Sequence, residues 1–120
     1  MRGKVVEASA LAALLFGEPA AEEVADRLGE GPLFAPTLLR YEVASVCLKK
    51  LRRNPERRDQ LLDALGLLGE LDIDEVQVPS GETVALAEEV DLTAYDAAYL
   101  WLSRWTGAEL VTLDERLEEA

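Results

Sequence analysis

The sequence predicts an α/β domain whose short, mostly parallel sheet is doubly wound, and three observations support this prediction. Short apolar segments alternate with helical patterns along the chain of 120 residues, the order typical of parallel strands joined by crossover helices. Glycine and proline separate these segments, and no repeat, low-complexity run or linker interrupts the alternation. A chain of this length buries most of its apolar surface without disulfides, so we expect residues 1–120 to form one domain.

The first half of the chain is expected to hold two strands and three helices. In order, these are a strand at residues 4–6, helices at 8–15 and 19–28, a strand at 33–35 and a helix at 37–53. Pro19 suits the first position of its helix, where the missing N–H has no helical partner anyway. The long helix is expected to bury an apolar stripe made of Leu38, Tyr41, Val46 and Leu48, which Val43 and Ala44 widen.

The second half is expected to hold three more helices and two more strands. In order, these are a leucine-rich helix that starts at Pro55, a strand at 75–78, helices at 81–90 and 94–105, and a strand at 109–113. Thr93 is a suitable N-cap for the helix at 94–105, and Gly107 stands where a C-terminal cap is expected. The stretch from 92 to 117 therefore predicts a turn, a helix, a short strand and another turn.

The residue types present exclude several kinds of catalytic site. Hydrophobic residues make up 49% and charged residues 30% of the chain, as in an ordinary globular domain. The chain has no histidine and one cysteine, Cys47, which argues against a zinc site of the usual ligands and excludes a histidine-based triad and an internal disulfide. Any catalysis is therefore expected to use carboxylates, hydroxyls, Lys or Arg, or a metal ion bound by oxygen.

The net charge of −12 is concentrated in the second half of the chain. Residues 1–60 carry 10 basic and 9 acidic side chains, whereas residues 61–120 carry 2 and 15. Such an acidic half argues against broad, nonspecific nucleic-acid binding, and it is compatible with a basic protein partner or with divalent cations. Glu7 interrupts any secretion signal, and the apolar run at 10–16 is too short to span a bilayer, so we expect a cytoplasmic protein.

Four acidic residues fall at positions that a parallel sheet would bring to one edge. Glu7 and Asp114 directly follow the first and last expected strands, Asp96 begins a helix, and Glu42 lies in an apolar part of the long helix. In an open α/β sheet the ligand crevice lies at the carboxyl ends of the strands. Carboxylates that converge there repel one another unless a cation lies between them, and oxygen ligands select Mg²⁺ or Mn²⁺. Such ions activate water for attack at phosphorus, which points to phosphodiester hydrolysis.

Four segments of the chain resemble a known family: VVEASALAALLFGEP, PTLLRYEVASVCLKKLR, LTAYDAAYLWLS and LVTLDERL. Over almost its whole length the sequence is similar to PIN-domain proteins, in particular to the VapC-like ribonuclease toxins of toxin–antitoxin modules. The resemblance implies a three-layer α/β/α domain, a Mg²⁺- or Mn²⁺-dependent endoribonuclease, an RNA substrate, an antitoxin partner and a homodimer. It implies catalytic and metal-binding roles for Glu7, Glu42, Asp96 and Asp114, and supporting polar roles for Ser9, Thr93 and Thr112.

Glu7 departs from the pattern of the family, which ordinarily has aspartate at this position. The additional methylene moves the carboxylate about one bond further into the cleft, and magnesium requires near-ideal octahedral geometry. An alternative function therefore stays open, in which the chain is a catalytically weakened PIN-fold module that binds a protein or RNA without cleavage. A third class is a phosphoacceptor domain with an acidic Mg²⁺ pocket. It fits less well because that class has a partner lysine near the last strand, and no lysine follows Lys50 in this chain.

Other polar and aromatic residues each have a structural and a functional interpretation. The four acids could simply favour helix N-termini, cap a helix or face solvent. Trp101 and Trp105 are four residues apart on one helix, which favours the core or a dimer interface over a base-stacking platform. The basic residues could be solvated at the end of the long helix or could contact RNA phosphates. The possible RNA contacts are Arg40, Lys49, Lys50, Arg52 and Arg53.

Overall fold

The central sheet has four parallel strands in the order β3–β2–β1–β4, which confirms the expected fold class. A computed structural model describes residues 2–120. The strands are β1 (Lys4–Val6), β2 (Leu33–Pro36), β3 (Ile73–Val76) and β4 (Glu109–Val111). The two central strands β1 and β2 contribute the fully buried side chains of Val5, Val6 and Ala35.

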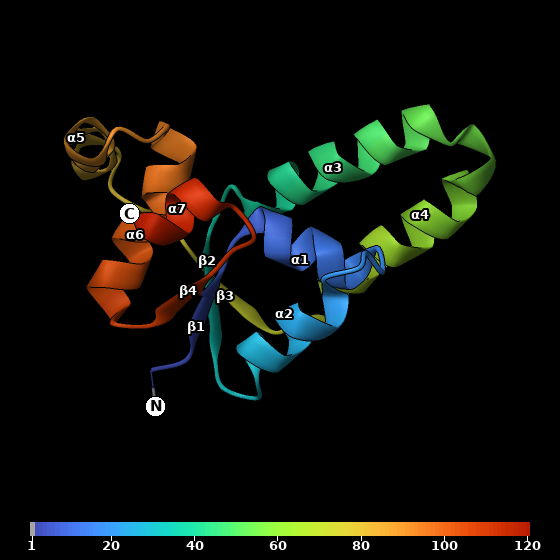
Figure 1. Cartoon of the computed structure of the whole chain (residues 1–120), viewed down its shortest axis with the longest axis horizontal. Helices are drawn as coiled ribbons and strands as arrows, with labels where there is room; N and C mark the ends of the chain where they lie inside the picture. Colours follow the sequence, from blue (N-terminus) through green and yellow to red (C-terminus); the bar gives the residue numbers. More distant parts are fainter. Residues whose placement is uncertain (1) are drawn as a thin grey trace.

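Helices cover both faces of the sheet and complete a three-layer α/β/α arrangement (Figure 1). Helices α1 and α2 join β1 to β2, whereas α3, a short 3₁₀ turn η1, α4 and a second turn η2 join β2 to β3. Helices α5 and α6 lead from β3 to β4, and α7 follows β4. The bounds are α1 (Ala8–Leu15), α2 (Ala21–Leu28), α3 (Leu39–Arg53), η1 (Pro55–Arg57), α4 (Arg58–Gly66), η2 (Leu67–Glu70), α5 (Ser80–Val90), α6 (Ala94–Thr106) and α7 (Glu115–Glu119).

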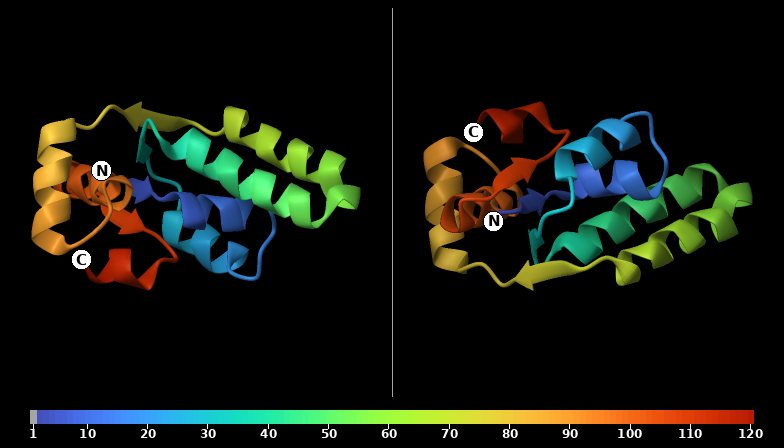
Figure 2. Two further views of the ribbon diagram at one scale, coloured as in Figure 1. Left: turned by 90° about the horizontal axis from the view of Figure 1, so that it is seen from above. Right: turned by 90° about the horizontal axis from the view of Figure 1, so that it is seen from below.

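The strand order explains why the helices divide between two faces. The chain moves from β1 to β2 to β3 in one direction and then crosses back to place β4 on the other side of β1. Because parallel crossovers are right-handed, a reversal of direction moves the connecting helices to the opposite face. In Figure 2 the helices α1 to α4 accordingly lie on one side of the molecule and α5 and α6 on the other. The reversal between β1 and β4 forms the switch point where ligand crevices open in such sheets.

Most predicted elements are present, and the third strand is shifted. It was expected at residues 75–78 but lies at Ile73–Val76, because β2 pairs with it in the register Leu33↔Ile73 to Pro36↔Val76. The pairing ends where the N–H of Thr37 donates to the carbonyl of Val76. The helices expected from residues 19 and 37 each begin two residues later, and the strand expected at 109–113 ends at Val111.

The apolar stripe predicted for the long helix was wrong for Tyr41 and Leu48, whereas Leu38 packs against the core and Val43 lies within it. The residues of α3 that are buried are Leu39, Val43 and Cys47, which recur every four residues along one face. Tyr41 is instead 81% exposed, and Leu48 is also exposed. The helix packs against α1 through this narrow stripe, so the neighbouring face that carries Tyr41 is left to solvent.

The caps of α6 agree with the prediction. The side chain of Thr93 accepts a hydrogen bond from the backbone N–H of Asp96 over 3.1 Å, and Gly107 adopts a φ of 75° at the C-terminal end. Within residues 2–120, the structure contains no helix that is both long enough and apolar enough to cross a membrane.

Candidate active site

Glu7 lies at the junction between β1 and α1, at the carboxyl edge of the sheet. Its backbone N–H donates to the carbonyl of Val111 over 3.0 Å, which continues the pairing of β1 with β4 by one residue. Its side chain is 7% exposed. Oε1 accepts hydrogen bonds from the hydroxyl of Ser9 and, over 2.6 Å, from the hydroxyl of Thr112. Two neutral donors on one oxygen thus stabilise the buried carboxylate.

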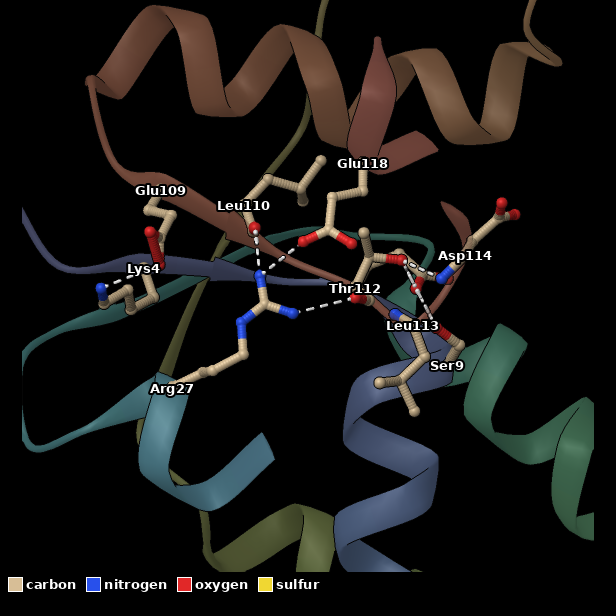
Figure 3. Close-up of polar contacts among 10 residues, drawn as sticks. Lys4, Ser9, Arg27, Glu109, Leu110, Thr112, Leu113, Asp114 and Glu118 are labelled. Carbon is tan, nitrogen blue, oxygen red and sulfur yellow. Dashed lines mark hydrogen bonds and ion pairs between the residues drawn. The ribbon is translucent and has the colours of Figure 1, made fainter. Parts of the chain in front are cut away.

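Ser9 and Thr112 also fix the loop that follows β4. The backbone N–H of Leu113 donates to Ser9 Oγ, and the N–H of Asp114 donates to Thr112 Oγ1, each over 3.0 Å (Figure 3). Each hydroxyl has a single hydrogen, which it gives to Glu7, so its lone pairs remain to accept from the backbone. The two hydroxyls therefore connect the carboxylate of Glu7 to the backbone that carries Asp114. The supporting role of Ser9 and Thr112 in a reaction stays a prediction, and these hydrogen bonds are what it would rest on.

Asp114 caps the N-terminus of α7. Its Oδ1 accepts from the backbone N–H groups of Arg116, over 3.0 Å, and Leu117, over 3.3 Å. Asp114 therefore has the structural role that sequence analysis allowed, a helix cap, and Oδ2 takes no part in these two bonds. Thr93 has a similar structural role, because it caps α6 by accepting from the backbone N–H of Asp96. The carboxylate of Asp96 takes no part in that bond.

Tyr99 connects α6 to Glu42 on α3. The phenol of Tyr99 is fully buried and donates to Glu42 Oε1 over 2.6 Å. Burial and the adjacent carboxylate raise the pKa of Tyr99 far above its usual value, so the phenol is a permanent donor at neutral pH. This bond gives Glu42 a fixed orientation, and the side chain of Glu42 is half-buried rather than freely solvated.

The pKa values of Glu42 and Asp96 are raised by burial and by the charges of other acids. Burial raises the pKa of Glu42, and the negative charges of Glu7 and Asp96 raise it further, against the opposing effect of the Tyr99 hydrogen bond. Burial likewise raises the pKa of Asp96, followed by the charges of Asp114 and Glu7. These charge effects link each of the four acids to at least one other, although within residues 2–120 no three acids lie close enough together to hold one ion.

A cavity of about 260 Å³ opens beside these acids between α1 and α3. Its lining residues are Glu7, Ala8, Ser9, Glu42, Ser45, Val46 and Lys49. A larger cavity of about 450 Å³ lies between α5 and α6 and contains none of the four acids among its lining residues. The smaller cavity is therefore the better candidate for the reactive cleft, because two of the four acids line it and one of them, Glu42, has a raised pKa.

The five basic residues considered as RNA contacts have different environments. Lys49 lines the cavity beside Glu7 and Glu42. Lys50, one position later, points to the other side of the helix, where it forms an ion pair with Glu18 and lies 5.8 Å from the centre of the Phe16 ring. Arg40 forms an ion pair with Glu75 over 2.7 Å. Arg52 and Arg53 are exposed in the last turn of α3.

Three residues near the acids were not identified from the sequence. Tyr99 lies on the same helix as Trp101 and Trp105, and its hydroxyl donates to Glu42. Arg27 of α2 donates to the carbonyls of Thr112, over 3.2 Å, and Leu110, and also pairs with Glu118 (Figure 3). Arg116 lowers the pKa of Asp96 and donates to Asp91 at the end of α5. An arginine isolated in an otherwise acidic segment, such as Arg116, is the one signal that could have been noticed.

The donor atoms of this region fit a hard divalent cation. Carboxylate and hydroxyl oxygens surround the cleft, and Mg²⁺ and Mn²⁺ prefer oxygen ligands. Within residues 2–120, however, no three Asp, Glu or Cys side chains lie close enough together to hold one ion. The negative charges of neighbouring acids contribute to the raised pKa values of Glu42 and Asp96. A cation bound near these acids would neutralise that charge.

Replacement of Thr112 by valine is expected to lower the free energy of unfolding by about 2–3 kcal/mol. Valine has nearly the same shape, but it removes a donor to the Glu7 carboxylate and leaves the N–H of Asp114 without its acceptor. Thr83→Val is the matched control, because Thr83 is also buried and its hydroxyl donates only to the carbonyl of Pro79. Urea unfolding measures both variants. An equal loss in the two would contradict the special role of the Thr112 hydroxyl.

Comparison with known proteins gives three consistent results. The model of the PIN domain family matches residues 4–120. Ribonuclease VapC3 of Pyrobaculum aerophilum is 35% identical over 96% of this chain and 92% of its own length. The crystal structure of PAE2754, also from Pyrobaculum aerophilum, superimposes with a TM-score of 0.76 and 28% identity, covering 98% of this chain and 78% of that one.

Proposed function

The chain belongs to the PIN-domain family, and on this premise we propose that it is a metal-dependent endoribonuclease that hydrolyses RNA phosphodiester bonds as the toxin of a toxin–antitoxin pair. The observation that carries the proposal is the cavity between α1 and α3 that Glu7 and Glu42 line, together with the raised pKa of Glu42, to which the charges of Glu7 and Asp96 contribute. Repulsion between acidic groups is a cost to folding, and acidic groups with perturbed pKa values cluster at functional sites.

Glu7, Glu42, Asp96 and Asp114 would hold Mg²⁺ or Mn²⁺ through their carboxylate oxygens. Such an ion supplies activation of water and neutralisation of charge on the phosphodiester. The protein positions the acids: Ser9 and Thr112 orient Glu7, and Tyr99 orients Glu42 through a donor that stays protonated. The oxygens that remain outside these bonds, such as Asp114 Oδ2, are the natural ligand atoms.

Lys49 is the best placed of the basic residues to contact an RNA phosphate, because it lines the cavity that contains Glu7 and Glu42. Arg52 and Arg53 extend the same helix into solvent and would add long-range attraction. Arg40 and Lys50 already form ion pairs with Glu75 and Glu18, so each would have to give up its partner to bind a phosphate. An antitoxin protein and a second copy of the chain are the proposed protein partners, and exposed apolar side chains such as Leu67 and Val84 provide surface for them.

Calorimetric titration of Mg²⁺ and Mn²⁺ into the metal-free protein tests the proposal. We expect saturable binding in the parent, loss of binding in Asp96→Asn, and cleavage of RNA by the parent only when one of these ions is present. Asparagine is nearly isosteric with aspartate and keeps the backbone N–H that donates to Thr93. A loss of binding in this variant would therefore be caused by the lost negative charge. Absence of binding by either ion, together with absence of cleavage, would refute the ribonuclease proposal.

A second candidate function is a PIN-fold module that binds a protein or RNA without cleavage. Two observations favour it: glutamate replaces the usual aspartate at position 7, and no three acids within residues 2–120 are grouped closely enough for one ion. Glu7→Asp discriminates between the two candidates. A large gain in Mg²⁺-dependent cleavage would identify a weakened enzyme, whereas no cleavage by either form would favour the binding module.

A further inference from the structure

Three aromatic side chains of the chain are largely exposed, and two of them directly precede an acid of the proposed site. Tyr41 is 81% exposed and precedes Glu42, whereas Tyr95 is 65% exposed and precedes Asp96. The third, Trp105, is 66% exposed at the opposite end of α6 and stacks on Trp101 with ring centres 5.5 Å apart. Tyr41 and Tyr95 thus have the exposure that a binding surface needs, and both are adjacent to the acids.

Helix geometry directs Tyr95 toward the same cleft. Residues four apart lie on one face of a helix, so Tyr95 lies one turn before Tyr99 on the same face of α6. Tyr99 points at α3, because its hydroxyl bonds to Glu42 over 2.6 Å. Tyr95 is therefore displaced from this contact by one turn toward the start of α6, which follows α5, and its side chain is open to solvent.

Tyr41 occupies the corresponding place on α3. It lies one turn before Ser45 on the same face, and Ser45 lines the cavity together with Glu42 and Lys49. Tyr41, Ser45 and Lys49 are spaced at intervals of four residues and form a row about 12 Å long on the surface of the helix. The row begins with an exposed aromatic ring and ends with a lysine, and the acids lie beside it.

Because the protein is strongly acidic, RNA binding needs contacts whose strength does not depend on charge. The net charge is −12, and the cleft itself is lined by carboxylates, so attraction of phosphates by the protein as a whole is weak. Stacking of a base on an aromatic ring does not depend on charge and is compatible with any base. Bases are free to stack on a protein only where they are unpaired.

We propose that Tyr41 and Tyr95 stack on bases that flank the scissile phosphodiester and so position the RNA at this site. The inference rests on the ribonuclease function proposed above. The two rings come from the first turns of α3 and α6, the two helices that the bond between Tyr99 and Glu42 joins. Bases held on the two rings would place the connecting backbone over the acids, while Lys49 contacts a phosphate further along the strand.

The test uses a short unstructured RNA that carries 2-aminopurine, whose fluorescence falls when the base stacks, and the full chain with Tyr41→Leu and Tyr95→Leu. Each variant is expected to weaken RNA binding about 5- to 100-fold and to reduce the quenching. The effect should appear mainly in KM, because stacking binds ground state and transition state alike. Tyr41→Phe and Tyr95→Phe keep the ring and should stay within about twofold of the parent, and Trp105→Leu is the control for loss of an exposed aromatic residue elsewhere.

Salt dependence separates stacking from contacts with phosphate. Lys49→Gln should reduce the magnitude of the slope of log affinity against log salt by about 0.7, whereas the tyrosine variants should leave this slope unchanged. The same strand annealed to its complement should be a poor substrate for the parent.

Three results would overturn the inference. Binding and cleavage at the parent level in both leucine variants would remove the stacking role and leave the ribonuclease proposal intact. A change of molecular mass on sedimentation in these variants, without a change in binding per site, would show that the tyrosines contact a second copy of the chain. Failure of the parent to bind or cleave any RNA would refute the proposed function itself.

Discussion

Asp96→Asn and Asp114→Asn should each lower the rate of RNA cleavage at least about 100-fold in Mg²⁺. The loss is expected because a neutral amide neither attracts a divalent cation strongly nor balances its charge in the transition state. Both substitutions keep the local structure. Asparagine is as good an N-cap as aspartate, so α7 keeps its cap at position 114, and the cap of α6 uses only the backbone N–H of residue 96.

Glu115→Gln is the matched control for these two variants. Glu115 is the exposed neighbour of Asp114 in the first turn of α7, and its substitution removes the same charge one residue away from the site. Steady-state cleavage of an unstructured RNA, with circular dichroism to verify folding, measures all three variants. If Asp96→Asn and Asp114→Asn cleaved at the parent rate, the assignment of the acidic site would be wrong.

Glu42→Gln and Asp96→Asn should make the metal-free protein more stable at pH 7, by about 0.5–2 kcal/mol, the range common for stabilising substitutions. Burial and mutual repulsion penalise the ionised carboxylates of Glu42 and Asp96 in the folded state. Glutamine keeps an oxygen that accepts the hydrogen bond of Tyr99, so Glu42→Gln removes the charge without the contact.

The pH dependence of this gain has a definite sign. The pKa values of both acids are raised above their ordinary values of 4.5 for Glu42 and 3.8 for Asp96, so the folded state holds these protons more tightly than the unfolded state. The two groups therefore make their full contribution to the free energy of unfolding at a pH below these ordinary pKa values. This contribution is lost as the pH rises through the raised pKa values of the folded state. The advantage of the variants should be largest near neutral pH and should disappear on acidification toward pH 4.

Urea unfolding across this pH range, with chelator present, measures the effect. Glu88→Gln controls for general relief of the net charge, because Glu88 is an exposed acid on α5 away from the cleft. A gain equal to that of Glu42→Gln would mean that overall repulsion, rather than the site, is responsible. Addition of Mg²⁺ should stabilise the parent through binding to the folded state and should have less effect on Asp96→Asn.

The sequence alone predicted most of the helices and strands, and it proposed the four acids as the site. Proline and glycine mark the ends of segments, Thr93 caps α6 as expected, and Asp114 caps α7, because these interactions involve residues two to three positions apart. The order of strands and helices determined a parallel sheet whose carboxyl edge brings Glu7 and Asp114 together. The resemblance to PIN domains, carried by the segments that contain the four acids, was confirmed by the family match over residues 4–120.

The contacts between distant parts of the chain were decided by the tertiary structure. Tyr99 and Glu42 are 57 residues apart, and nothing in the local pattern of either indicates the other. The register of β2 against β3 moved the third strand to Ile73–Val76, because strand pairing selects the partner residues.

Adjacent residues can also acquire opposite roles through packing. Lys49 lines the cavity and Lys50 pairs with Glu18, since successive residues of a helix point about 100° apart. The burial of Leu39, Val43 and Cys47 likewise left Tyr41 on the surface beside the acids. Local signals act over a few residues and therefore fix caps and periods, whereas the side chains that orient the acids and line the cleft depend on which faces of distant helices meet.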